Sequence, residues 1–392
     1  IRNNGGYQGI KSDARGHFID DAPYAEPFDD LESNPYKDAF WRWWPELCKE
    51  LEEIRVTGGE PLMTPDIYQL FDWFETTEEP NAKNMRLAIN SNLMAKENLL
   101  NKLIESTQHI NRFHLYTSCE AYGKQAEYIR DGLKWDIWTS QFERICSEAR
   151  IEGLHMMMTI NALCLDTITE FLDWVLEMKR KYGHNKPGIS VNILRFPSFQ
   201  SPLTLPDNMR KLYHDELQAW LENVRSKAEV DAEGRLLLAD WEQDQISRLI
   251  EYLDVVKTPH RNTADRTLLE HDFKIFYEQY DARRFMNFRE TFPRLAEFYD
   301  GIKIMDIDQD EEVQAPKTFG VKDSLFAKRI VTEDGEVKVV EMKMRGRNTG
   351  ESDEWYDNPL DPESRAELMK KIGGSSIGWD TETDGLGGAQ DE

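Results

Sequence analysis

Long apolar runs and short-spaced cysteine pairs are both missing from this sequence of 392 residues. No stretch stays apolar over the roughly 20 residues that a transmembrane helix needs, and no signal peptide pattern opens the sequence, so we expect no membrane partner. The four cysteines lie far apart and form no CxxC pair, at Cys48, Cys119, Cys146 and Cys164. This spacing indicates neither a zinc site nor a disulfide framework, so we expect reduced cysteines in a cytoplasmic protein.

Positive charge is scarce, because 48 lysines and arginines stand against 73 aspartates and glutamates. The formal net charge of −25 repels the phosphate backbone of a nucleic acid, so we expect no nucleic-acid partner. A local basic pocket stays compatible with this charge. Hydrophobic residues make up 40% of the chain, which is enough for a substantial core.

Strand-like apolar runs alternate with amphipathic helical segments from about residue 50 to about residue 205. The predicted strands are Glu53–Thr57, Met85–Asn90, Arg112–Thr117, His155–Ile160 and Gly188–Leu194. The predicted helices between them cover residues 64–77, 96–106, 138–153 and 166–183. This alternation is typical of right-handed βαβ units, and it predicts an α/β fold with a parallel sheet.

The pattern changes after Pro206. Residues 207–300 are mostly helical and charged, and residues 324–346 predict a β-hairpin with Asp334 and Gly335 at its turn. The tail from about residue 350 is acidic and rich in glycine, and we expect its last residues to be disordered. The chain therefore divides into three expected parts, at residues 1–206, 207–349 and 350–392.

Small polar or charged residues follow almost every predicted strand. In strand order they are Gly58–Pro61, Asn90–Asn92, Ser118–Glu120, Asn161 and Arg195. Ligands of parallel α/β folds bind outside the carboxyl ends of the strands, so these residues predict a binding face. The alternative for Asn92, Ser118 and Asn161, taken singly, is an ordinary helix N-cap.

The segment Gly58-Gly59-Glu60-Pro61 carries more than turn chemistry, which accounts for one glycine and the proline only. Gly59 lets the backbone approach a ligand closely. Glu60 then lies at the strand end, where its carboxylate can accept charge-assisted hydrogen bonds from an ammonium group. A phosphate cradle would need a lysine or a helix N-terminus without an acid, so the segment predicts a cationic ligand group.

Residues 55–61, RVTGGEP, resemble the GGE motif that ends the second strand of radical SAM enzymes. The resemblance implies a partial (β/α)6 TIM-like barrel, followed by a mostly helical extension like the twitch extension of some phage and marine bacterial members. It implies that Glu60, with the backbone of Gly58, Gly59 and Pro61, binds the amino group of S-adenosylmethionine (SAM). The further SAM-binding residues that it implies are Asn90 at a strand end, Ser118, Glu120 and Asn161 at the ribose, Arg130 at the carboxylate, and Leu194 beside the adenine.

The resemblance also implies a [4Fe–4S] cluster and an electron donor such as flavodoxin or ferredoxin. In this family, reductive cleavage of SAM yields a 5′-deoxyadenosyl radical, which would abstract hydrogen from an unknown peptide or small metabolite in the cytoplasm of a bacterium or a phage-infected host. The CxxxCxxC segment that holds the family's cluster is absent from the sequence.

Three alternatives follow from this absence. We expect the cysteine triad and a first strand to lie upstream of Ile1 in a longer chain. The second alternative is a degenerate barrel that binds SAM or a partner without a cluster and without catalysis. The third is an ordinary α/β enzyme in which the segment TGGEP is a coincidence.

Overall fold

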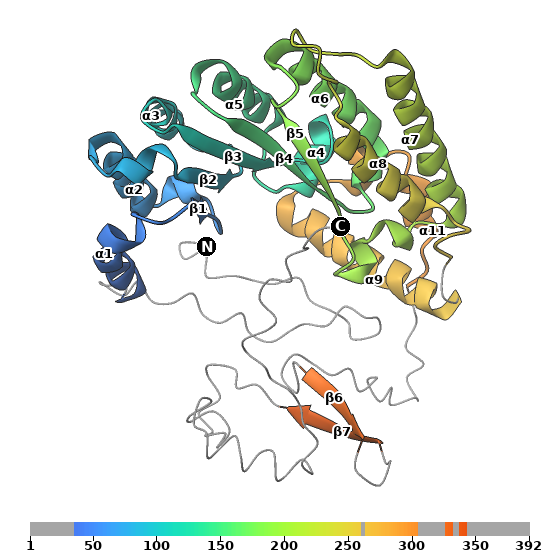
Figure 1. Cartoon of the computed structure of the whole chain (residues 1–392). Coiled ribbons are helices and arrows are strands. Elements are labelled where there is room, and N and C mark those ends of the chain that lie inside the picture. The colour runs from blue at the N-terminus through green and yellow to red at the C-terminus, as the bar shows by residue number, and fades with distance from the viewer. Residues whose placement is uncertain (1–34, 260–262, 305–325, 332–336, 343–392) are drawn as a thin grey trace. The chain divides into compact units, whose positions relative to one another are not determined.

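The computed structural model describes residues 35–259, 263–304, 326–331 and 337–342. Its centre is a parallel sheet whose strand order is β1-β2-β3-β4-β5 (Figure 1). The strands are β1 (Glu53–Val56), β2 (Arg86–Ser91), β3 (Arg112–Ser118), β4 (Gly153–Ile160) and β5 (Gly188–Ile193). The predicted α/β fold with a parallel sheet is confirmed, and each of the five strands ends within two residues of its predicted bounds.

Crossover helices connect the strands. They and the preceding helix are α1 (Pro35–Leu47), α2 (Pro65–Thr76), α3 (Glu97–Thr107), α4 (Gly123–Ile129), α5 (Trp135–Glu148) and α6 (Ile168–Tyr182). A strand order without reversal places crossovers of one hand on one face of the sheet. Figure 1 shows α3, α5 and α6 along the same side of the strands. These five strands therefore lack the reversal of a doubly wound sheet.

The side chains of β3 and β4 alternate between a buried face and a more open face. Leu115 on β3 and Met156 on β4 are fully buried in the core that includes Leu103 and Phe142 of the helices. The intervening positions, such as Tyr116 and His155, are half-buried. Because side chains of a strand alternate between its faces, the second face of the sheet carries polar residues.

The chain after the sheet is mostly helical, as predicted. Its helices are α7 (Asp207–Lys227), α8 (Asp240–Leu253), α9 (Thr263–Arg284), α10 (Phe288–Thr291) and α11 (Ala296–Gly301). The short 3-10 helices are η2 (Pro61–Met63), η3 (Pro80–Lys83), η4 (Cys164–Thr167), η5 (Ser198–Gln200) and η6 (Pro202–Thr204). None of the described helices combines the length and the hydropathy needed to cross a bilayer.

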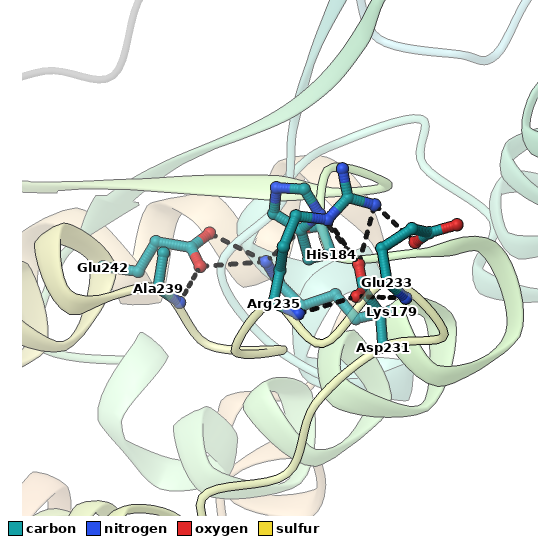
Figure 2. Close-up of polar contacts among 7 residues, drawn as sticks. All are labelled: Lys179, His184, Asp231, Glu233, Arg235, Ala239 and Glu242. Atoms are coloured by element: carbon teal, nitrogen blue, oxygen red, sulfur yellow. Dashed lines mark hydrogen bonds and ion pairs between the residues drawn. The ribbon is translucent and has the colours of Figure 1, made fainter.

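A buried ion pair holds α8 against α6 and β5 (Figure 2). Lys179 Nζ donates to both carboxylate oxygens of Glu242 at 2.9 Å and to the backbone oxygen of His184 at 2.7 Å. The exposed fractions of the two charged side chains are 0% and 1%. Glu242 also accepts hydrogen bonds from the backbone nitrogens of Ala239 at 2.9 Å and Ile189 at 2.7 Å. Glu242 therefore joins the start of α8 to the strand edge.

The described residues between Pro35 and Ile304 belong to one compact unit, and β6 (Phe326–Val331) and β7 (Val337–Met342) belong to a second. The strands β6 and β7 are antiparallel, and Val331 lies opposite Val337, which confirms the predicted strand pair. The turn at Asp334 and Gly335, residues 1–34 and the tail at 350–392 lie outside the described residues. The boundaries at residues 206 and 349 stay predictions.

Candidate functional site

The turn after β1 has the backbone that its two glycines allow. The φ angle is +87° at Gly58 and +53° at Gly59. A Cβ atom built at either glycine meets nothing within 4 Å, so the conformation and not a lack of space requires glycine there. Both residues are exposed at the carboxyl end of β1, which leaves room for a ligand at this turn.

Glu60 follows this turn and joins the ends of two strands. Its Oε1 accepts hydrogen bonds from Ser91 Oγ at 2.8 Å and from the Leu62 nitrogen at 3.2 Å, and its Oε2 accepts one from the Asn92 nitrogen at 2.7 Å. An ionised carboxylate offers about four acceptor positions, so this half-buried group keeps one for a ligand donor. This structural role was not predicted, because Ser91 and Asn92 lie a full βαβ unit further along the chain.

The asparagines at two strand ends cap local turns. Asn92 Oδ1 accepts a hydrogen bond from the Met94 nitrogen at 2.8 Å. Asn161 Oδ1 accepts hydrogen bonds from the nitrogens of Leu163 at 2.9 Å and Cys164 at 3.2 Å. Neither asparagine is the N-cap of a helix, because the N-caps of α3 and η4 are Lys96 and Leu163; each side chain instead makes a turn with the backbone two residues on.

Asn90 differs from these asparagines. Its Nδ2 lies 3.7 Å from Met157 Sδ, and its Oδ1 is buried without a hydrogen-bond partner among the described residues. A buried acceptor without a partner is destabilising, and a ligand donor would satisfy it. Ser118 ends β3 half-buried, opposite Met157 in the sheet register, and the Leu194 nitrogen donates to the Ile160 oxygen at 2.9 Å.

Glu120 and Arg130 form an ion pair with each other. Arg130 donates to Glu120 Oε2 from its NH2 group at 2.6 Å and from Nε at 3.1 Å. The Glu120 side chain is 3% exposed and that of Arg130 is 31% exposed. Burial raises the pKa of Glu120, and the Arg130 guanidinium opposes that increase. Arg130 still has N–H donors at its exposed end, so it can meet a ligand anion while it holds Glu120.

The parallel sheet brings these residues to one edge. Glu60, Asn90, Ser118, Asn161 and Leu194 each lie at or just beyond the carboxyl end of a different strand. Neighbouring strands are in register, from Val56 opposite Ile89 to Ile160 opposite Ile193, so their ends meet. The arrangement offers acceptors near β1 and β2 and a guanidinium after β3.

A second polar group lies on the open face of the sheet, nearer the amino ends of the strands. Glu152 Oε2 lies 2.9 Å from His114 Nε2, and His114 Nδ1 lies 2.9 Å from His155 Nε2. The Tyr116 ring stacks on His155 with centroids 4.5 Å apart. Glycine is required at position 153 beside these hydrogen-bonded histidines, because a Cβ atom there would lie 2.5 Å from His155 Nε2 and 2.8 Å from His114 Nδ1.

His114 and His155 lie side by side, although 41 residues separate them in the sequence. Both residues lie at positions of β3 and β4 whose side chains point away from the apolar core. The alternation of buried and less buried positions along each strand is the sequence signal that could have placed them on the same face. Burial, with a smaller contribution from His114 and nearby cations, lowers the pKa of His155 to about 4. His155 is therefore neutral at pH 7, and its Nε2 shares one proton with His114 Nδ1.

The cysteines do not fit an iron–sulfur cluster. All four are free and buried, and they are Cys48, Cys119, Cys146 and Cys164. Burial raises the pKa of Cys119 and that of Cys146 to about 12, so both are neutral thiols at pH 7. Within the described residues, no three histidine, cysteine, aspartate or glutamate side chains are grouped as metal ligands.

Comparisons with known proteins add no relative. The chain matches no protein-family model, no curated protein and no solved structure. The proposals below therefore depend on the sequence pattern and on the geometry of the carboxyl edge.

Proposed function

We propose that this protein binds SAM at the carboxyl edge of its sheet and that it is a cytoplasmic member of the radical SAM enzymes. The observation that carries the proposal is the position of Glu60, directly after two glycines with positive φ at the end of β1. The sequential strand order supports a partial (β/α)6 TIM-like barrel, because successive strands of a barrel are neighbours.

The contacts proposed for Glu60, Arg130 and Asn90 use atoms that are still able to bond. The remaining acceptor position of Glu60 and the carbonyls of Gly58–Pro61 would hold the ammonium of SAM, and the free donors of Arg130 would hold its carboxylate. Asn90 Oδ1 would accept from the ligand. The proposed ribose contacts are Ser118, Glu120 and Asn161, and the backbone at Leu194 would flank the adenine.

The full activity of the family requires a [4Fe–4S] cluster, which supplies one electron from a donor such as flavodoxin or ferredoxin. The four buried cysteines do not supply three neighbouring thiolates. For the residues present, the proposal is therefore limited to binding and orienting SAM. Formation of 5′-deoxyadenosyl radical and hydrogen abstraction from a peptide or small metabolite are proposed only for a protein that holds the cluster.

The second candidate function is SAM binding without catalysis, and it is favoured because the described residues hold no group of three neighbouring cysteines. Anaerobic incubation with iron, sulfide, dithionite and SAM separates the two functions. Release of 5′-deoxyadenosine supports the radical enzyme. Saturable SAM binding without 5′-deoxyadenosine supports the binding protein.

A pair of matched variants tests the role of Glu60. Glu60 precedes Pro61 and accepts from the Leu62 nitrogen at 3.2 Å, while Glu79 precedes Pro80 and accepts from the Asn81 nitrogen at 3.2 Å. Glu60→Gln should weaken SAM binding by about tenfold or more, since a hydrogen bond to a charged group contributes ~1.5–3 kcal/mol. Glu79→Gln should leave the affinity unchanged. Equal SAM dissociation constants for the two folded variants would refute the role of Glu60.

A further inference from the structure

A cleft lies between the carboxyl end of β5 and helix α8. Its volume is about 570 Å³, and its lining includes Asn192, Ile193, Arg195, Arg248, Tyr252 and Lys257. Arg195 follows Leu194 directly, so the cleft opens at the same edge of the sheet as the proposed adenine contact. Asn192 lies opposite Thr159 in the sheet register.

Helix α8 covers the outer edge of β5 with side-chain acceptors that recur every three residues. Glu242 Oε1 accepts from the Ile189 nitrogen at 2.7 Å, and Gln245 Oε1 accepts from the Val191 nitrogen at 2.6 Å. In a parallel strand every second N–H points to the same side, so the Ile193 N–H points outward as well. The next helix position in the series is Arg248, which has only donors.

At this third position, the Ile193 N–H and the Arg248 guanidinium are therefore both hydrogen-bond donors. Ile193 and Arg248 both line the cleft, where the series of Glu242 and Gln245 would place another acceptor. A ligand that accepts hydrogen bonds from both groups would complete the edge. An anion with several oxygens meets that requirement.

The charges around the cleft also favour an anionic ligand. Most arginines in the described part of the chain pair with a carboxylate, such as Arg180 with Glu229 and Arg289 with Asp300. No carboxylate within the described residues pairs with Arg195 or Arg248, in a chain whose acids outnumber its bases 73 to 48. The one described contact of the Arg195 guanidinium is with the Tyr252 ring, whose centroid is 6.0 Å away.

We infer that this cleft binds a phosphate group of a small molecule. Its charged residues are Arg195, Arg248, Lys257 and Glu251, and three cations with one carboxylate leave a net charge of +2. Lys257 Nζ pairs with Glu251 at 3.1 Å, which leaves the two arginines for the ligand. A phosphate monoester carries about −1.5 to −2 at pH 7 and matches this charge, whereas a single carboxylate leaves one arginine unmatched.

The further step, that the bound molecule is a phosphorylated substrate of the SAM-dependent reaction, rests on the proposed function. Because the cleft opens beside Leu194, a phosphorylated small molecule held there would lie at the edge that we propose for SAM. The phosphate group would be held by the arginines, and the rest of the molecule would extend toward the strand ends.

Binding of inorganic phosphate to the full chain tests the cleft without reference to activity. Calorimetric titration at low ionic strength should show one saturable site, and Arg195→Gln and Arg248→Gln should each weaken it about tenfold or more. Arg42→Gln, an exposed arginine on α1, is the matched control and should leave the affinity unchanged. Succinate, titrated in parallel, should bind more weakly than phosphate.

Arg248→Gln has a second readout, because it places at the third position the same acceptor that Gln245 provides at the second. Its melting temperature without phosphate should equal or exceed that of the parent protein, while phosphate should no longer raise it. Absence of saturable phosphate binding, unchanged affinity in both arginine variants, or tighter binding of succinate would overturn the inference.

The same titrations distinguish this cleft from the SAM site. Glu60→Gln should retain phosphate binding even where SAM binding is lost. Phosphate binding that depends on Arg195 and Arg248 supports the cleft even if SAM does not bind. Phosphate binding lost in Glu60→Gln but retained in Arg248→Gln would refute the position proposed here.

Discussion

Replacing Glu242 by glutamine should destabilise the protein much more than replacing the nearby surface residue Glu233 by glutamine. The substitution leaves the Lys179 ammonium, which is 0% exposed, beside a neutral amide. The new amide nitrogen would also face one of the donors that Glu242 now satisfies, which are Lys179 Nζ and the nitrogens of Ile189 and Ala239. Removing one partner of a buried ion pair costs about 3–5 kcal/mol.

Urea unfolding followed by tryptophan fluorescence measures this loss. With an m-value of about 3 kcal/mol/M, the midpoint should fall by about 1 M or more. Glu233→Gln is the matched control, since Glu233 pairs with Arg235 at the surface and its side chain is 62% exposed. A surface pair contributes ~0–1 kcal/mol, so its midpoint should barely move.

The double variant Lys179→Met, Glu242→Gln separates lost charge balance from lost shape. It should be less destabilised than Glu242→Gln alone, because no charge then stays buried without a partner. If Glu242→Gln lowers the midpoint no more than Glu233→Gln does, the explanation of how α8 is held to β5 is wrong.

Two further predictions concern the histidine pair on the open face of the sheet. The pKa of His155 is lowered to about 4, so the unfolded chain, with a pKa of about 6.5, takes up the proton first and stability should fall as the pH drops from 6.5 to 4. Urea midpoints measured across that range should depend less on pH in His155→Gln, and an unchanged dependence would contradict the lowered pKa. Gly153→Ala should lower the urea midpoint by the equivalent of about 1–3 kcal/mol, because its Cβ would lie 2.5 Å from His155 Nε2. Gly301→Ala, where a Cβ meets nothing within 4 Å, should show no such loss, and equal midpoints for the two alanine variants would refute the steric explanation.

The strands were predictable because their pattern is local. In β4, apolar residues buried in the core recur at every second position, from Leu154 through Met156 and Met158 to Ile160. Such alternation shows in the sequence whatever the rest of the chain does. The start of α5 was predicted less exactly: the helix begins at Trp135 in the structure, whereas the sequence pattern predicted a start at Trp138. Helix starts depend on capping, and Lys134 makes no side-chain cap there.

The contacts of the site were not predictable in the same way. Glu60 was expected to bind a ligand, and its bonds to Ser91 and Asn92 appear only when β1 and β2 pair. Glu242 belongs to a segment that was predicted to be helical and charged, yet it is buried against Lys179, 63 residues before it. A partner at that distance in the chain leaves no periodic signal, so neither burial nor charge pairing can be derived from the sequence.

SAM binding is the most direct test of the central proposal. Calorimetric titration of the full chain with SAM, under anaerobic conditions and at low phosphate, should show one saturable site whose affinity falls about tenfold or more in Glu60→Gln but not in Glu79→Gln. Absence of saturable SAM binding to the folded parent protein would contradict the proposed function.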